Sequence, residues 1–150
     1  MERYRKSKSK KVILASDHAG FKLKENIKKF LIKKRKKVLD LGTESTISVD
    51  YPDYAHLLSK KMKKSKNYFG ILVCATGIGM SMAANKHKNI RAALCHNFKS
   101  TKLSREHNNA NVMAIGARLT KKNIALKCVD TFLNTNFDGG RRHLRRIKKI

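Results

Sequence analysis

The chain has 150 residues, of which none is tryptophan, one is proline and only 10 are acidic. Its apolar runs are far shorter than the roughly 18 residues that a membrane-spanning helix needs, so we expect no transmembrane segment. Residues 1–11 lack the apolar core of a signal peptide. Cysteine is scarce as well: Cys74, Cys95 and Cys128 are odd in number and widely spaced. This spacing argues against a disulfide framework and predicts a reducing, cytoplasmic location.

The acidic residues are outnumbered by 36 lysines and arginines, which gives a formal net charge of +26. A charge of this size is typical of nucleic-acid-binding proteins, because clustered cations gain affinity by releasing phosphate counterions. Here the excess is spread along the chain: residues 1–11 contribute +5, residues 141–150 contribute +6, and the rest lies between them. We therefore expect a basic surface with at most weak, non-specific nucleic-acid binding, and no membrane binding.

Hydrophobic residues make up 41% of the chain, enough to pack one core at this length. Short apolar runs alternate with segments of helical periodicity, which is typical of a parallel sheet joined by helices. Strands are predicted at 12–15, 38–41, 69–74, 91–95 and 112–116. Helices are predicted around 23–33, 52–65, 79–87, 98–107 and 121–134, with a last one after Gly139-Gly140. The predicted fold is α/β, a three-layer sandwich with a five-stranded parallel sheet, helices on both faces and a C-terminal helix. We expect one domain at 11–150 behind a basic, disordered tail at 1–10.

Ligands of open parallel sheets bind beyond the carboxyl ends of the strands. Asp17 and His18 follow the first strand, residues 74–79 the third and Arg118 the fifth. In the loop after the third strand, the Thr76-Gly77-Ile78-Gly79 turn leads into a helix, where backbone N–H groups can approach an anion. It is neither a Walker loop nor a complete dinucleotide motif, and a tight turn without a ligand explains it equally well.

Cys74 stands at the end of the third strand and before a helix N-terminus, a setting that favours a thiolate. The alternative, a small buried hydrophobe, is the usual role of a free cysteine and suits Cys95 and Cys128. Among the six histidines, His18 beside Asp17 and His107 beside Asn108 stand out as strand-end candidates. His56, His87 and His143 have no supporting neighbours in the sequence.

No His, Cys and Asp set has the spacing of zinc ligands, so we expect neither a metal nor another cofactor. The basic C-terminal segment places Arg141 and Arg145 on one face if it is helical. Guanidinium groups there would suit a phosphate, and a solvated basic end is the alternative.

A series of motifs resembles those of the type B ribose-5-phosphate isomerases, in order and at family spacing from about residue 11 to 148. The motifs are ASDHAGF (15–21), DYPDYA (50–55), CATGIG (74–79), AANK (83–86), LSREHN (103–108), NV (111–112), GAR (116–118) and FDGGR (137–141) with Arg145. The family also includes galactose-6-phosphate isomerase subunits and allose-6-phosphate isomerases.

The resemblance implies a Rossmann-like fold and cofactor-free interconversion of ribose 5-phosphate and ribulose 5-phosphate, in the non-oxidative branch of the pentose phosphate pathway. It also implies a homodimer or homotetramer with sites at the dimer interface that draw on both chains. By the same resemblance, Cys74 moves the proton between C2 and C1, His107 helps to open the sugar ring and Thr76 supports the thiolate. The remaining site residues are Asp17 for the sugar hydroxyls; the backbone amides of Ala75, Thr76, Gly77, Ile78 and Gly79 for the enediolate oxygen; His18, Arg141 and Arg145 for the phosphate; and Tyr51, Asn108 and Arg118 as further lining.

One departure from the family pattern is Ala75, where the family usually has glycine. If that position required a positive φ, the alanine would strain the loop. Two alternatives to a ribose-5-phosphate isomerase stay open on the sequence: the same chemistry on a six-carbon sugar phosphate, and a non-catalytic α/β fold that binds RNA through its charge. The intact Cys74, Thr76, His107, Arg141 and Arg145 set argues against the second.

Overall fold

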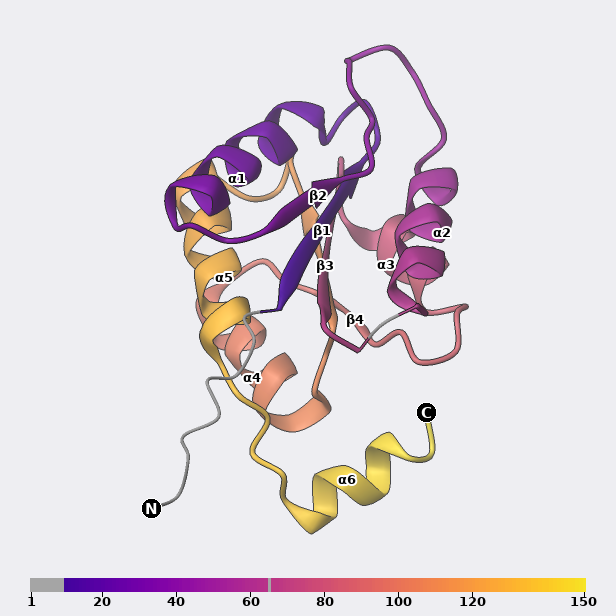
Figure 1. The fold of residues 1–150 in the computed structure, drawn as a ribbon, viewed down its shortest axis with the longest axis vertical. Coiled ribbons are helices and arrows are strands. Elements are labelled where there is room, and N and C mark those ends of the chain that lie inside the picture. The colour runs from indigo at the N-terminus through magenta and orange to yellow at the C-terminus, as the bar shows by residue number, and fades with distance from the viewer. Residues whose placement is uncertain (1–9, 65) are drawn as a thin grey trace.

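The structure is a computed structural model that describes residues 10–64 and 66–150, so the predicted tail lies outside the described residues except for Lys10. All five predicted strands form one parallel sheet in the order β2-β1-β3-β5-β4 (Figure 1). The strands are β1 (Lys11–Ser16), β2 (Val38–Asp40), β3 (Tyr68–Cys74), β4 (Ala92–Leu94) and β5 (Val112–Gly116). The helices are α1 (Phe21–Lys33), α2 (Tyr51–Met62), α3 (Ile78–Ala84), α4 (Phe98–Asn108), α5 (Lys122–Asn134) and α6 (Arg141–Ile147). The predicted α/β sandwich with a C-terminal helix is confirmed, and no helix among the described residues is long and apolar enough to cross a membrane.

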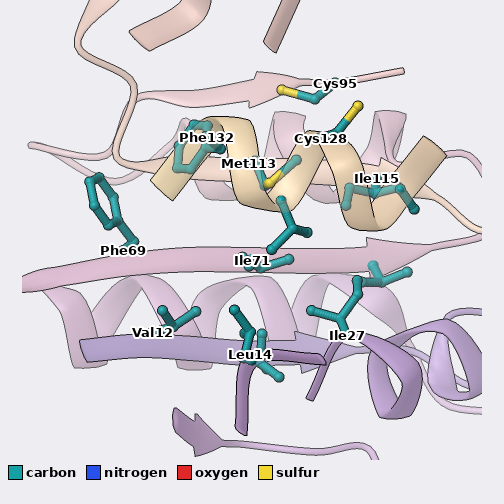
Figure 2. Close-up of a cluster of buried hydrophobic side chains, with 14 of the residues drawn as sticks. Val12, Leu14, Ile27, Phe69, Ile71, Cys95, Met113, Ile115, Cys128 and Phe132 are labelled. Carbon is teal, nitrogen blue, oxygen red and sulfur yellow. The ribbon is translucent and has the colours of Figure 1, made fainter. Parts of the chain in front are cut away.

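The strands alternate their side chains between two cores, one on each face of the sheet. Leu14 of β1, Ile71 of β3 and Met113 of β5 pack with α1 and α5 (Figure 2). Ile13 and Leu72, on the opposite side of the strands, pack with α2 and α3. This period of two places the side chain of Cys74, two residues after Leu72, on the face covered by α2 and α3.

Two predicted helices end earlier than expected. Helix α2 ends at Met62, three residues before the predicted end. Helix α3 ends at Ala84 because the next residue, Asn85, ties the chain to the edge strand β4. Its side-chain amide donates to the Ala92 carbonyl at 2.9 Å and its oxygen accepts from the Ala92 N–H at 2.8 Å. This pair of bonds fixes where the α3 segment meets the sheet.

The central strands β1 and β3 are neighbours whose chains leave the sheet toward opposite faces. The chain leaves β1 toward α1 on one face and leaves β3 toward α3 on the other (Figure 1). Ser16 pairs with Val73, and the Asp17 N–H donates to the Val73 carbonyl at 3.2 Å, so the two strands end side by side. A divergence of this kind opens the crevice in which ligands of parallel sheets bind.

A buried ion pair joins α1 to β2. The Lys24 side chain has no exposed surface, and its ammonium lies 2.7 Å from Asp40 Oδ2 and 2.8 Å from Glu25 Oε1. Burial alone would raise the pKa of Asp40, but hydrogen bonds from Lys24, the Gly42 N–H and Lys28 together hold it below its usual range. The Asp40 carboxylate therefore stays charged and compensates the buried ammonium.

We expect Asp40→Asn to lower the free energy of unfolding by about 3 kcal/mol, because it removes a counter-charge from a buried ammonium. Since the pKa of Asp40 is lowered in the folded protein, its contribution to the free energy of unfolding is complete at pH values above the usual range of carboxyl pKa values. This contribution is lost as the pH falls through the pKa that Asp40 has in the folded protein. Urea unfolding at neutral and acidic pH measures both effects. Lys28→Met is the control, because the Lys28 side chain is 36% exposed and should contribute less than about 1 kcal/mol. An equal loss in the two variants would contradict the expectation.

Candidate active site

Asp17 and His18 directly follow β1 at the carboxyl end of the sheet. Asp17 is 5% exposed, and its Oδ1 accepts a 2.9 Å hydrogen bond from the Gly20 N–H. The Val49 N–H donates to His18 Nδ1 at 3.1 Å, while the Val49 carbonyl oxygen lies 3.2 Å from the same nitrogen. In the tautomer in which Nδ1 accepts from the Val49 N–H, the ring proton is on Nε2. Asp17 Oδ2 thus remains as an acceptor and His18 Nε2–H as a donor for a ligand.

The loop after β3 closes around the sulfur of Cys74. Cys74 is 4% exposed, and its Sγ accepts a 3.0 Å hydrogen bond from the Gly77 N–H. Thr76 Oγ1 accepts in turn from the Ile78 N–H at 3.2 Å. A small buried hydrophobe would account for the burial of Cys74 but not for a backbone donor aimed at its sulfur. That donor stabilises negative charge on the sulfur, as a nucleophile or base requires.

The left-handed residue of this loop is Gly77, with a φ of +75°. A Cβ on Gly77 would also lie 2.7 Å from Leu94 Cδ1 and 2.8 Å from the Ile115 carbonyl carbon, so glycine is required there twice over. Ala75 is not among the described residues with a positive φ. The alanine at this position therefore imposes no left-handed strain, and the departure from the family pattern is accommodated.

Tyr51 and Arg118 contact the same loop near its two ends. A Cβ on Gly79 would lie 2.5 Å from the ring carbon Cζ of Tyr51 and 2.7 Å from its hydroxyl oxygen, so the ring rests directly against Gly79. The Arg118 N–H donates to the Ala75 carbonyl at 2.9 Å, and the Arg118 side chain is exposed. The structure thus brings Asp17, His18, Tyr51, Arg118 and the whole 74–79 loop to one end of the sheet.

The other two cysteines lie in the core between the sheet and α5 (Figure 2). Burial raises the pKa of the Cys95 thiol to about 11, against the weaker opposing effects of hydrogen bonds with Thr101 and Ser104. Cys95 is therefore a neutral thiol at physiological pH. Cys128 is 1% exposed and packs in the same cluster. Both match the predicted role of small buried hydrophobes.

His107 and Asn108 lie at the opposite end of the sheet from Cys74. Helix α4 carries the chain from the carboxyl end of β4 back to the start of β5, and these two residues are the last of the helix. The seven residues of β3 alone span roughly 20 Å at about 3.3 Å per residue. The prediction that His107 belongs to a strand-end loop beside the others is wrong, because the helix returns it to the amino-terminal edge.

Arg141 and Arg145 are exposed on α6, which lies beyond the same amino-terminal edge (Figure 1). The segment before α6 is joined to α4 by the Asp138 N–H, which donates to the Glu106 carbonyl at 3.1 Å. The predicted site residues thus form two groups within one chain. The group at the carboxyl edge holds Cys74, and the group at the amino edge holds His107, Asn108, Arg141 and Arg145.

Three histidines that seemed unsupported in the sequence have close partners in the structure. The ring of His143 stacks on that of His107, with centroids 4.5 Å apart and an angle of 11° between the planes. His143 Nε2 also lies 3.3 Å from Asp138 Oδ2. His56 Nδ1 lies 2.7 Å from His87 Nε2, between α2 and the end of the α3 segment. No spacing along the chain signals these pairs, because their members are 36 and 31 residues apart.

His107, Asp138 and His143 offer ligand atoms within 4.8 Å of one another, the only such group of three that could hold a metal ion in the described part of the chain. The lone pairs of an imidazole lie in its ring plane, and the two rings are nearly parallel. The nitrogens therefore do not converge on one ion in this arrangement. The observed contacts are those of a stacked pair held by a carboxylate.

The sequence profile of a known family, described as Ribose/Galactose Isomerase, matches residues 12–150. The chain belongs to this family. It is accordingly a sugar phosphate isomerase, and the resemblance carried by the motifs is confirmed.

Solved structures of family members match the whole fold. A ribose 5-phosphate isomerase of Thermotoga maritima is 51% identical with a TM-score of 0.90, over 93% of this chain and 96% of that one. Ribose-5-phosphate isomerase B of Mycoplasma genitalium, solved with bound ribulose-5-phosphate, is 45% identical with a TM-score of 0.88, over 93% of this chain and 92% of that one. Ribose-5-phosphate isomerase B of Escherichia coli is 40% identical over 94% of each chain.

Proposed function

We propose that the protein interconverts ribose 5-phosphate and ribulose 5-phosphate through an enediolate, with Cys74 as the base. The observation that carries the proposal is the Cys74 sulfur, buried at the end of β3 and held by the Gly77 N–H at 3.0 Å. The bound ribulose-5-phosphate of the Mycoplasma genitalium relative supports the choice of substrate.

The chemistry needs a base next to C2 and donors for a developing oxyanion. The Cys74 thiolate removes the C2 proton of the open-chain aldose, the electron pair forms the C1–C2 double bond, and O1 takes the negative charge. Returning the proton to C1, with transfer of a proton from O2 to O1, gives the ketose. Because the Gly77 and Ile78 N–H groups are bonded within the loop, the remaining amides of 75–79 are the donors for O1. Asp17 holds the sugar hydroxyls through Oδ2.

The second group of site residues is supplied by another copy of the chain. His107 opens the furanose ring by proton transfer, Asn108 lines the site, and Arg141 and Arg145 bind the phosphate together with His18. Since the length of β3, roughly 20 Å, separates the edge that holds His107 from Cys74 of the same chain, one chain cannot bring both to one sugar. A symmetric dimer in which α4 and α6 of one chain meet the β1–β3 crevice of the other gives two complete sites.

A coupled assay of ribose 5-phosphate, allose 6-phosphate and galactose 6-phosphate, on protein treated exhaustively with a chelator, tests this proposal. We expect turnover to be highest with ribose 5-phosphate and to need no added metal or nucleotide. Preference for a six-carbon substrate would refute the substrate assignment. Activity that returns only with a divalent cation would refute the cofactor-free mechanism.

The phosphate assignment predicts that Arg141→Ala and Arg145→Ala each raise the Michaelis constant, because each removes a charge-assisted hydrogen bond of about 1.5–3 kcal/mol. The value of kcat should change less. Arg142→Ala and Arg146→Ala are matched controls, since they remove the same charge from the neighbouring pair of positions on α6. Steady-state kinetics of the four variants decide which pair faces the substrate. Larger effects at Arg142 and Arg146 would transfer the assignment to them.

A further inference from the structure

A cavity lies at the amino-terminal edge of the sheet, away from the Cys74 loop. Its volume is about 530 Å³, and its walls include Lys10 before β1, Tyr68 at the start of β3 and Asn111 before β5. Of its twelve lining residues, six are cationic and none is acidic. The cationic residues are Lys10, Lys63, Lys66, Lys88, Arg91 and Arg105.

Two of these cations are held by hydrogen bonds to backbone and side-chain oxygens near the ends of α4 and α5. Arg91 donates from Nη2 to the Asn109 carbonyl at 2.9 Å and from Nε to the same oxygen at 3.1 Å. Arg105, which is 5% exposed, donates from Nε to the Thr135 carbonyl at 3.1 Å and from Nη1 to Asn109 Oδ1 at 3.0 Å. These bonds leave Arg91 Nη1 and Arg105 Nη2 without an acceptor among residues 10–64 and 66–150. Two oriented donor groups are therefore in place before any ligand arrives.

The cations of the cavity also repel one another. Burial lowers the pKa of Lys10, and the nearby charges of Arg105 and Arg91 lower it further. Burial likewise lowers the pKa of Arg105, with Arg91 adding to the effect. No carboxylate among the lining residues offsets this repulsion. Uncompensated charge concentrated in a cavity is typical of a ligand site, because a bound anion relieves it.

We propose that this cavity binds a polyphosphate anion, a ligand that carries several phosphate groups in a row. A single phosphate has a charge of about −2 and could engage only some of the six cations. A volume of 530 Å³ also falls in the usual range of small-molecule sites, about 300–1,000 Å³. Inorganic polyphosphate and nucleoside polyphosphates share this chemistry, and Tyr68 and Met62 in the lining supply an apolar surface for a base.

Isothermal titration of the full chain with inorganic tripolyphosphate, at fixed ionic strength, tests the proposal. The variant Lys63→Glu/Lys66→Glu/Lys88→Glu reverses three exposed lysines of the cavity. The control Lys29→Glu/Lys33→Glu/Lys122→Glu reverses three exposed lysines outside its lining and gives the same net charge. We expect the cavity variant to bind tenfold or more weakly, on the order of the loss of one or two charge-assisted hydrogen bonds. The control should stay within about threefold of the unmodified protein, since the charge it removes lies away from the ligand.

Equal weakening in the two variants would mean that only the overall charge attracts the anion, and would overturn the proposal. Orthophosphate binding as tightly as tripolyphosphate would also overturn the proposal. The same holds if a short single-stranded RNA displaces tripolyphosphate at a total phosphate concentration lower than that of the bound anion. ATP binding more tightly than tripolyphosphate would support the nucleoside form, and equal binding would support the inorganic form. The neutralising variant Lys66→Gln/Lys88→Gln gives a second measurement of the affinity for tripolyphosphate. Unchanged isomerase activity shows that each variant is folded.

Discussion

Cys74→Ser is expected to lower kcat for ribose 5-phosphate by roughly 10²–10⁴-fold, the usual contribution of a positioned base. Serine keeps the size of the side chain and the contact with the Gly77 N–H, but its hydroxyl is far less acidic than a thiol. Substrate affinity should therefore change little, because the hydroxyl and phosphate contacts stay in place. The coupled assay gives kcat, and equilibrium titration with ribose 5-phosphate gives the affinity.

The matched controls for this variant are Cys95→Ser and Cys128→Ser. Both cysteines lie in the core on the opposite face of the sheet from the Cys74 side chain, so turnover per folded protein should be unchanged. The polar hydroxyl in an apolar core should instead reduce stability by about 1–3 kcal/mol. Substantial turnover in Cys74→Ser would remove Cys74 from the mechanism. Loss of turnover in a folded Cys95→Ser protein would mean that Cys74 is not the reactive thiol.

A mixed dimer of two inactive chains is expected to recover activity. One chain carries Cys74→Ser and the other His107→Asn, each with its own affinity tag, and the mixed species is purified through both tags. If every site combines Cys74 of one chain with His107 of the other, the mixed dimer has one intact site and one doubly altered site. It should then show about half the turnover of the unmodified dimer.

Recovery of this kind cannot occur if both residues act within one chain. In that case each site of the mixed dimer would carry one of the two substitutions, and turnover would stay near that of the parent variants. Light scattering on the unmodified protein gives the number of chains that the calculation requires. A monomeric active protein would contradict the shared site directly.

The motifs of the proposed active site could be located from the sequence because each is local. Residues 74–79 follow an apolar run, and the glycines predict a tight turn before a helix; the structure has Cys74 at the end of β3 and Gly77 in the left-handed conformation. Ala75 could not be judged in the same way. Whether its position needs a positive φ depends on how the loop closes over Cys74, and only the folded backbone answers that.

The histidines show where local reasoning fails. His143 gains a stacked partner in His107 and a carboxylate in Asp138 because α6 lies beside the end of α4. His56 and His87 meet because α2 packs beside the α3 segment. Contacts between elements distant in the chain leave no periodic trace in the sequence, so no pattern could have paired these side chains.

By itself the sequence determined the five parallel strands, their alternation with helices and the tight turn that follows Cys74 at the end of β3. These follow from the period of the apolar residues and from turn residues, which act over a few positions. The tertiary structure alone decided which candidates lie together at one edge of the sheet. Parallel strands need helices that return the chain to the starting edge, so α4 carries His107 away from Cys74. The same return path gathers six cations around a cavity at the amino-terminal edge, although they are scattered from Lys10 to Arg105 along the chain.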